Sequence, residues 1–374
     1  MQTRWSLLTE PIIRARSVSG SLTLHTLPSL FIALTEDQIQ DFPALRPHQR
    51  HPWHALMVQL AALVRHHLKQ IPSTEQAWSE ALCNLSSGEE RESIWCLVSP
   101  LDQPAFLQPP VPENQLDAWK GVSNTPDELD MLVTSKNHDL KAARMHHAAP
   151  DEWLFSLVSL QTQEGFLGAG NYGISRMNGG FASRPGIGVV PSGGIGRRWL
   201  RDTDKLLAAR DSITTTYGLC EPGGTALVWE LPWDGSTSLA FETLDPFYIE
   251  ICRRVRLVTN GLGRILARNT GTKAARISAS TRNGMTGDAW TPLNKSEGKA
   301  LTITSTGFDY RLASELLFGG RFASPPAQQL EPADGTEGIS VIAQGVTRGQ
   351  GKTEGFQRSG YSPAVSRYSK RQPD

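Results

Sequence analysis

The stretch WHALMVQLAALVRHHL, residues 53–68, decides how the N-terminal part of this chain folds. Its apolar residues recur at steps of three and four, the spacing that places side chains on one face of a helix. These residues are Trp53, Met57, Leu60, Ala61, Val64 and Leu68. Arg65, His66 and Lys69 stand at its C-terminal end, where the helix dipole favours positive charge. The pattern predicts an amphipathic helix with its apolar face in the core.

The segments around this helix have mixed character. Residues 1–35 alternate polar and apolar positions around SLTLHTLPSLFIAL, which predicts short strands before the helix. A second helix is expected near 75–85, and a buried apolar segment at 153–163. The runs ALVWELPW at 226–233 and FYIEICRRVRLV at 247–258 predict strands of a second sheet. We therefore expect an α+β protein, a loop-rich mixed fold with short sheets and few helices.

Length and composition predict the domain organisation. The chain has 374 residues, enough for more than one core, and its 34 glycines and 24 prolines favour frequent changes of direction. We expect a large mixed α/β domain at 1–321, with a sub-boundary near 205–220. A Pro- and Gly-rich linker is expected at 322–338, a wedge-like segment at 339–358 and a flexible tail at 359–374.

Charge and cysteine content exclude several classes of protein. Lys plus Arg and Asp plus Glu each number 37, so any grip on nucleic acid must come from local patches. The four cysteines lie far apart without a CxxC pair, which argues against a zinc ribbon or a disulfide framework and predicts reduced thiols. No stretch has the roughly 18 apolar residues of a membrane helix. We expect a cytoplasmic protein without a membrane partner, metal or cofactor.

Two long stretches contain cations but no acidic residue. Residues 165–201 are rich in glycine and carry five arginines, and residues 251–287 carry seven arginines and one lysine. Glycines let the backbone approach a phosphate or a base edge, and arginines neutralise phosphates. Because alternate residues of a strand share a face, Arg254 and Arg256 are predicted to point toward one partner. The alternative for the first stretch is a set of turns on a basic surface. The alternative for the second is a solvated strand edge whose charges prevent pairing with another strand.

Three other patterns give weaker evidence for a specific function. RGQGKTEG, residues 348–355, resembles a phosphate-binding loop, but Val346 stands where that motif needs glycine, so ATP binding is not expected. His48, His51 and His54 lack a nearby carboxylate or thiol to complete a metal shell, and we interpret them as a surface cluster at a helix start. His138 and Asp139 could serve catalysis, but no nucleophile motif accompanies them.

Several segments, in this order, resemble CasA, the large subunit of the type I-E CRISPR effector Cascade, over most of residues 20–358. Besides the early strand and helix, they are PAFLQP at 104–109, VTSKNHDLK at 133–141, GFLGAG at 165–170, GDAWTPLNKSEGKAL at 287–301 and RGQGKTEGF at 348–356. The resemblance implies a non-catalytic subunit that recognises the PAM beside a target in double-stranded DNA and helps start duplex opening and R-loop formation. Its implied partners are the other Cascade subunits, the crRNA, target double-stranded DNA and a recruited nuclease or helicase.

The resemblance also implies roles for particular residues. Family members insert a glycine loop and a lysine into the minor groove, where readout depends on groove shape and close backbone approach. The residues at the matching positions are Gly165, Phe166, Gly168, Gly170 and Asn171 for the loop, and Lys273 for the lysine, with Lys295 and Lys299 as alternatives. Arg176, Arg254 and Arg256 are expected to bind DNA as basic residues.

A wedge and a loop complete the implied site. The wedge, which carries a glutamine in the family, corresponds to Gly349, Gln350, Gly351 and Lys352. The polar loop with Lys136, Asn137, His138 and Lys141 is expected to contact the complex near the crRNA end.

The sequence departs from the family pattern in two ways. It lacks the paired cysteines that some members carry near the second basic patch, and it ends where typical members continue into a C-terminal helical bundle. We therefore interpret it as a short variant, in which holding the displaced strand and engaging the helicase-nuclease are absent or fall to another polypeptide. Such an effector is expected to be coupled to a different nuclease or to a transposition machinery. Two alternatives from other classes stay open: an RNA-binding scaffold that reads no DNA motif, and a hydrolase or transferase that uses His138 and Asp139.

Overall fold

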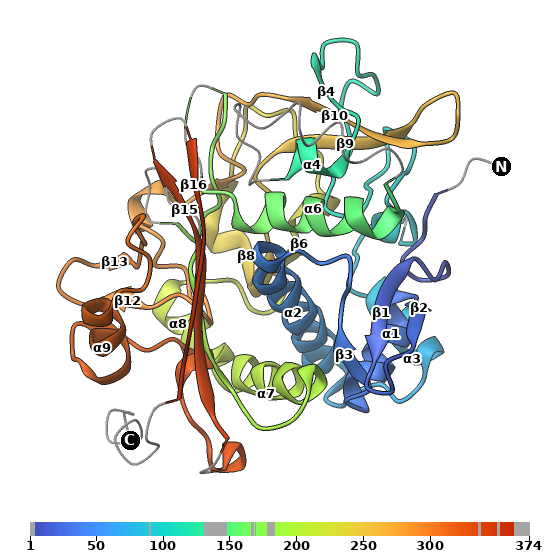
Figure 1. Ribbon diagram of the computed structural model, residues 1–374. Coiled ribbons are helices and arrows are strands. Elements are labelled where there is room, and N and C mark those ends of the chain that lie inside the picture. Colours follow the sequence, from blue (N-terminus) through green and yellow to red (C-terminus); the bar gives the residue numbers. More distant parts are fainter. Residues whose placement is uncertain are drawn as a thin grey trace.

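The fold is built around helix α2 (Arg50–Leu68), which crosses the middle of the molecule (Figure 1). The computed structural model describes residues 4–89, 91–130, 148–165, 168, 170–177, 184–335, 338–349 and 352–362. Helices α6 and α7 and strand β8 pack against α2. The described helices are α1 (Leu27–Thr35), α2, α3 (Glu75–Cys83), α4 (Pro126–Leu129), α6 (Pro150–Gln163), α7 (Ile195–Ala208), α8 (Arg210–Tyr217) and α9 (Tyr310–Phe318).

Short sheets surround these helices. Three-stranded sheets have the orders β2-β1-β3, β4-β10-β9, β13-β12-β14 and β16-β15-β5, and two-stranded sheets are β11-β7 and β6-β8. The first ten strands are β1 (Ile13–Ser17), β2 (Leu22–His25), β3 (Ile39–Asp41), β4 (Gly121–Ser123), β5 (Gly186–Val190), β6 (Thr225–Leu227), β7 (Leu239–Ala240), β8 (Leu244–Ile249), β9 (Arg254–Thr259) and β10 (Ile265–Thr270). The others are β11 (Ile277–Ser278), β12 (Leu293–Asn294), β13 (Lys299–Ala300), β14 (Phe322–Ala323), β15 (Ser340–Gly349) and β16 (Lys352–Tyr361). The predicted mixed fold class is confirmed.

The predicted helices are confirmed, but α2 is more deeply buried than expected. Every side chain from Ala55 to Val64 lies in the interior. Gln59, on the face expected to be polar, donates from Nε2 to the carbonyl of Tyr248 at 2.8 Å. A helix that is covered on all sides must satisfy its few polar groups internally. The expectation of a single apolar face is therefore wrong, and α2 is the central helix of the core.

The segment Ser21 to Leu34, which was predicted to form short strands, contains one strand, β2, followed by helix α1. After β2, Thr26 caps α1, because its side chain accepts from the backbone N–H of Ser29 at 3.1 Å, and Pro28 fits the first turn. The expected apolar segment at 153–163 is helix α6. Of the run at 226–233, only β6 is a strand. These corrections share one cause, since capping and packing are not encoded in the local alternation of apolar residues.

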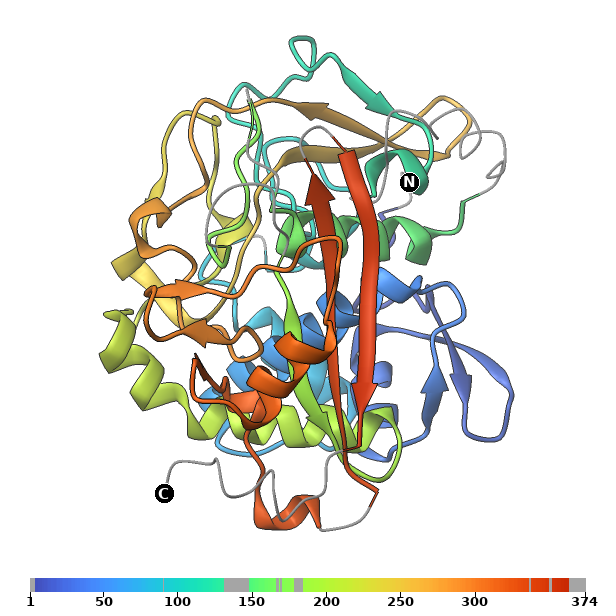
Figure 2. The same ribbon diagram turned by 60° about the vertical axis from the view of Figure 1, so that its left-hand side comes forward.

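The C-terminal part is more ordered than predicted. Residues 322–338, expected as a linker, contain β14 and two 3₁₀ turns, and Ala327, Gln328 and Asp334 are buried. One hydrophobic cluster contains buried side chains from both sides of 205–220. The hairpin β15–β16 runs along one side of the molecule (Figure 2), and β16 extends to Tyr361, three residues into the expected tail. Residues 363–374 lie outside the described residues.

Two further expectations concern cysteines and membranes. All four cysteines are free, Cys96 and Cys252 being buried and Cys83 and Cys220 half-buried. Within the described ranges, no helix combines the length and the apolar character needed to cross a membrane.

Candidate nucleic-acid interface

The glycine loop after α6 is a tight turn closed by its own backbone. Gly168 and Asn171 exchange two N–H to carbonyl hydrogen bonds, both 2.8 Å long. Gly170 between them has φ +74°, a left-handed conformation that side chains with a Cβ rarely adopt. Gly165 is buried at the base of the loop. Phe166 lies outside the described residues. Gly170 is therefore a position in the loop whose backbone conformation favours glycine.

The structure places Lys273 directly beside this loop. The backbone N–H of Thr272 donates to the carbonyl of Gly170 at 2.9 Å, and the Tyr172 hydroxyl donates to the carbonyl of Lys273 at 2.9 Å. A third bond runs from the Lys273 N–H to the carbonyl of Gly235 at 2.7 Å. The Lys273 side chain is exposed. Segments about 100 residues apart in sequence thus place a backbone-bonded glycine turn beside an exposed cation.

The two alternative lysines lie in a different setting. Lys295 lies in the turn between β12 and β13, and Lys299 is the first residue of β13. The Lys299 ammonium pairs with Glu297 at 2.5 Å, and the Lys295 N–H donates to the carbonyl of Arg321. Among the three lysines that the sequence left open, the bonds to the glycine loop therefore favour Lys273.

The three basic residues predicted to contact DNA are buried and bound within the chain. Arg176 is 4% exposed, pairs with Glu250 at 2.8 Å and covers the ring of Tyr248. Arg254 is 6% exposed and pairs with Glu113 at 3.3 Å. A guanidinium with these partners and this burial has no free face for a phosphate. The prediction that these side chains are DNA contacts is therefore wrong for this conformation.

Arg256 organises a segment that the family resemblance had singled out. It is fully buried, and its guanidinium donates to the backbone carbonyls of Ser99, Pro100, Gln103, Gln108 and Pro109. Burial lowers its pKa to about 10. Arg254 and Arg256 do point to the same side of β9, as predicted, but their common partner is residues 99–119 of the same chain. PAFLQP, residues 104–109, thus has a structural role.

Other arginines of the two acid-free stretches also have partners that are distant in sequence. Arg184 pairs with Asp288 of the GDAW segment, and Arg201 pairs with Asp334 at 2.5 Å. Arg276 donates to the carbonyls of Val228, Leu231 and Pro232. Burial opposes ionisation of Asp288, but Arg184 outweighs it and holds the pKa of that carboxyl at about 2. Several of the cations that stood out in the sequence are therefore used within the fold, as ion pairs or as donors to backbone carbonyls.

The wedge segment is the end of a hairpin held by the body of the protein. Strand β15 pairs with β16 on one side and with β5 on the other, and the last paired residues are Gly349 and Lys352. Gln350 and Gly351 lie outside the described residues. Both views place the Gly349–Lys352 end on the side of the molecule that carries β4, β9 and β10 (Figures 1 and 2). The hairpin is a suitable support for a projecting tip.

Near the start of α2, His48 and His51 are buried and His54 is half-buried, so their interpretation as a surface cluster is wrong. His48 contacts Asp130 at 2.7 Å and His54 contacts Asp202 at 2.8 Å, both through Nε2. Burial, aided by Arg184, lowers the pKa of His51 well below its usual value. No group of metal-ligating side chains occurs in the described part of the chain. Lys136, Asn137, His138, Asp139 and Lys141 lie outside it, so the crRNA-end loop and the catalytic alternative stay untested.

Sequence reasoning missed Tyr172 and the way it ties the loop to Lys273. Its only signal was an aromatic residue within a glycine-rich stretch, GNYG at 170–173. A hydroxyl that bonds to a segment about 100 residues away cannot be inferred from spacing.

Comparisons with known proteins agree with this geometry at the level of fold. No family model matches the chain, and no curated protein matches it by sequence. CRISPR-associated protein Cse1 from Acidimicrobium ferrooxidans matches with TM-score 0.60 and 16% identity, over 96% of this chain and 71% of that chain. CasA of Thermus thermophilus gives TM-score 0.60 and 15% identity, with coverages of 96% and 72%.

A CRISPR RNA-guided surveillance complex also contains a matching chain, with TM-score 0.51 and 16% identity, over 99% of this chain and 77% of that one. At such identities the agreement shows a shared fold. The chain therefore has the fold of CasA (Cse1), as the resemblance in its sequence predicted.

Proposed function

We propose that this chain is the large subunit of a crRNA-guided Cascade complex, in which it recognises the PAM in target double-stranded DNA and helps to open the duplex. The observation that carries the proposal is the contact between the glycine loop and Thr272–Lys273, which we call the Lys273 segment. The backbone N–H of Thr272 makes this contact by donating to the carbonyl of Gly170. A bare glycine turn beside one exposed cation suits the minor groove, where base readout is degenerate and close backbone approach matters.

The hairpin β15–β16 supports the second part of the proposal. Gln350 and Gly351 would form the wedge at its end, between Gly349 and Lys352. Small flanking residues permit a tight turn and add little bulk as base pairs separate. Lys136, Asn137, His138 and Lys141 would contact the complex near the crRNA end. A nuclease or helicase would be recruited after R-loop formation.

The test measures binding of a fluorescent duplex to the reconstituted guide-RNA complex, with and without this chain, on targets that differ only in the flanking motif. Discrimination between motifs that requires the chain is expected. Equal binding to all targets would instead favour the RNA-binding scaffold.

The wedge is tested separately with Gln350→Ala. This variant should slow duplex opening, followed by 2-aminopurine fluorescence, and leave first contact with DNA intact. Equal loss of both steps would contradict the wedge assignment. A bulky residue at Gly168 should weaken first contact, and unchanged binding would remove the glycine loop from the site.

A further inference from the structure

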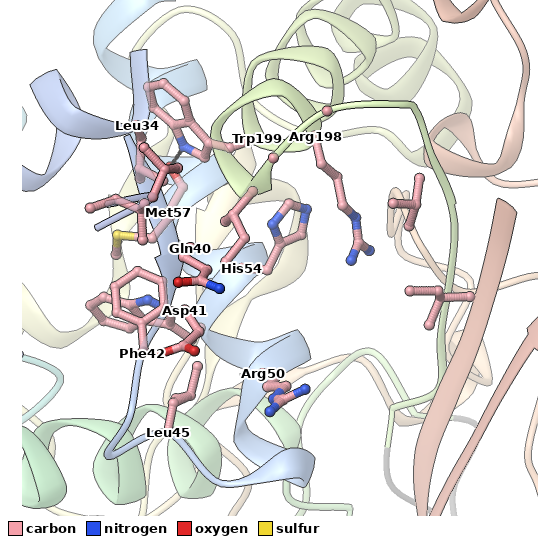
Figure 3. A pocket seen from close by; sticks show the side chains of 18 of the residues that line it. Leu34, Gln40, Asp41, Phe42, Leu45, Arg50, His54, Met57, Arg198 and Trp199 are labelled. Atoms are coloured by element: carbon pink, nitrogen blue, oxygen red, sulfur yellow. Dashed lines mark hydrogen bonds between the residues drawn. The ribbon is translucent and has the colours of Figure 1, made fainter. Parts of the chain in front are cut away.

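A cavity whose lining includes no residue of the glycine loop lies between α2, β3, α7 and the hairpin β15–β16. Its volume is about 470 Å³, within the range of small-molecule sites in proteins. Figure 3 shows Leu34, Phe42, Leu45 and Met57 on one side of the cavity and Arg198 and Arg50 on the other. The residues that form it span positions 18 to 358, so no local motif could have indicated it.

The lining is mostly apolar and includes aromatic rings. Phe42, Trp53 and Trp199 contribute these rings, together with aliphatic side chains from β5, α7 and β15. The cavity therefore offers a surface for a flat apolar body.

Three arginines from different elements reach this cavity: Arg50 from α2, Arg198 from α7 and Arg358 from β16. In the described part of the chain, neither Arg50 nor Arg358 has a carboxylate within ion-pair distance, and Arg198 has only Asp202 at 3.9 Å. Asp41 also lies at the cavity, where it pairs with Arg16 at 3.5 Å.

Positive charge is concentrated around Arg198. Burial lowers the pKa of Arg198, and the nearby charges of Arg201 and Arg358 lower it further, against the opposing effect of Asp202. This contrasts with Arg176, Arg184 and Arg201, each of which binds a carboxylate. An anion at the cavity would relieve the repulsion between Arg198 and Arg358.

We propose that this cavity binds an aromatic phosphate monoester, with the ring system against the apolar wall and the phosphate on Arg198 and Arg358, assisted by Arg50. A phosphate suits the site better than a carboxylate, because its three oxygens and its double charge match several guanidinium forks. The ring would pack on the aromatic side chains. None of these residues belongs to the glycine loop or the Lys273 segment, so the assignment is independent of the proposed function.

The test is calorimetric titration of the full chain with 1-naphthyl phosphate, in a buffer free of phosphate. Saturable binding at one site is expected, with 1-naphthol and inorganic phosphate each binding at least about tenfold more weakly, since each lacks half of the interaction. Absence of binding, or naphthol binding as tightly as naphthyl phosphate, would overturn the proposal.

Variants locate the site. Arg358→Gln changes an exposed side chain, so folding should be kept, and it should weaken binding by about tenfold. Val18→Glu adds a negative charge at a position that is 57% exposed and lines the cavity, and it should weaken binding more than Val18→Gln. Arg264→Gln, on the exposed turn between β9 and β10, is the matched control and should bind normally. Equal affinities in all four variants would refute the location.

Further titrations distinguish two sources of such a ligand, a free nucleotide and the end of a nucleic-acid strand. AMP and UMP represent free nucleotides, and a 5′-phosphorylated octathymidylate, compared with its unphosphorylated form, represents a strand end. Competition with naphthyl phosphate by the mononucleotides alone would assign a free ligand. Competition by the phosphorylated strand would assign a nucleic-acid end. Competition by the unphosphorylated strand with equal strength would contradict the role of the phosphate.

Discussion

Strand β9 and the Lys273 segment come from the same acid-free stretch of sequence, but the fold uses their charges in opposite ways. Arg256 of β9 is completely buried and donates to the carbonyls of residues 99–109, whereas the Lys273 side chain is exposed beside the glycine loop. Both cations lack acidic neighbours in sequence. A missing local acid therefore does not identify a free positive surface, because distant carboxylates can neutralise a cation and backbone carbonyls can bind its N–H groups.

The largest expected effect is the loss of stability caused by Arg256→Met. It leaves at least five carbonyls, two of them in PAFLQP, without their buried donor, and should lower the free energy of unfolding by about 3–5 kcal/mol. Urea denaturation followed by fluorescence measures this. Arg264→Met, at an exposed position, should stay within about 0.5 kcal/mol of the parent. Similar stabilities of the two variants would mean that Arg256 is not a structural residue.

The next largest effect is the dependence of stability on pH that comes from the buried pair of Arg184 and Asp288. The pKa of Asp288 is held at about 2, below its unfolded value near 4, so the pair stabilises the fold above pH 4. That contribution, about 2 kcal/mol, should be lost as the pH falls from about 4 to 2. Unfolding free energies measured at pH 5 and pH 3 should therefore differ less in Asp288→Asn than in the parent. An unchanged difference would exclude Asp288 as a source of acid sensitivity.

Lys273→Ala should leave stability unchanged, because the side chain is exposed, and should weaken binding of motif-bearing duplex in the assembled complex by about fivefold. The slope of the logarithm of the binding constant against the logarithm of the salt concentration should become shallower by about one, because about one counterion fewer is released on binding. Lys295→Ala is the matched control, since Lys295 is also exposed but lies on the β12–β13 turn. If Lys295→Ala has the larger effect, the choice of Lys273 is wrong.

The smallest effect is expected for Tyr172→Phe. This change removes the hydroxyl that donates to the Lys273 carbonyl and should reduce duplex affinity by at most about twofold, since one partly exposed hydrogen bond is lost. Tyr310→Phe, at a position that is 86% exposed, serves as the control for loss of a hydroxyl. A Tyr172→Phe effect as large as that of Lys273→Ala would mean that the position of the lysine, and not its charge alone, decides binding.

The sequence predicted those parts of the fold that depend on local periodicity and ordered motifs. Helices α2 and α3 followed from apolar spacing, and the segments from PAFLQP to RGQGKTEGF indicated the CasA fold. The burial of His48 could not be predicted, because its partner, Asp130, stands 82 residues away. Residues 322–338 resembled a linker by composition, but Arg201 and the core hold residues 322–335, the part of this stretch that the structure describes without a gap.

The candidate site shows the same division. Gly168 and Gly170 were identified from the motif GFLGAG, whereas the choice among three lysines required a hydrogen bond between Thr272 and Gly170. The cavity with Arg50, Arg198 and Arg358 had no sequence signal, because a concave surface is formed only when distant segments pack.

The pairing of β15 between β16 and β5 has a mechanical consequence. Hydrogen bonds of an antiparallel ladder lie across the strand axis, so a push on the Gly349–Lys352 end along that axis loads many of them simultaneously in shear. A ladder loaded in this way resists far more force than one opened bond by bond from its end. Strand β5 pairs only with Ser340–Gln344, so a thrust on the described end would pass along the two-stranded part of the hairpin to a base that is held on both sides.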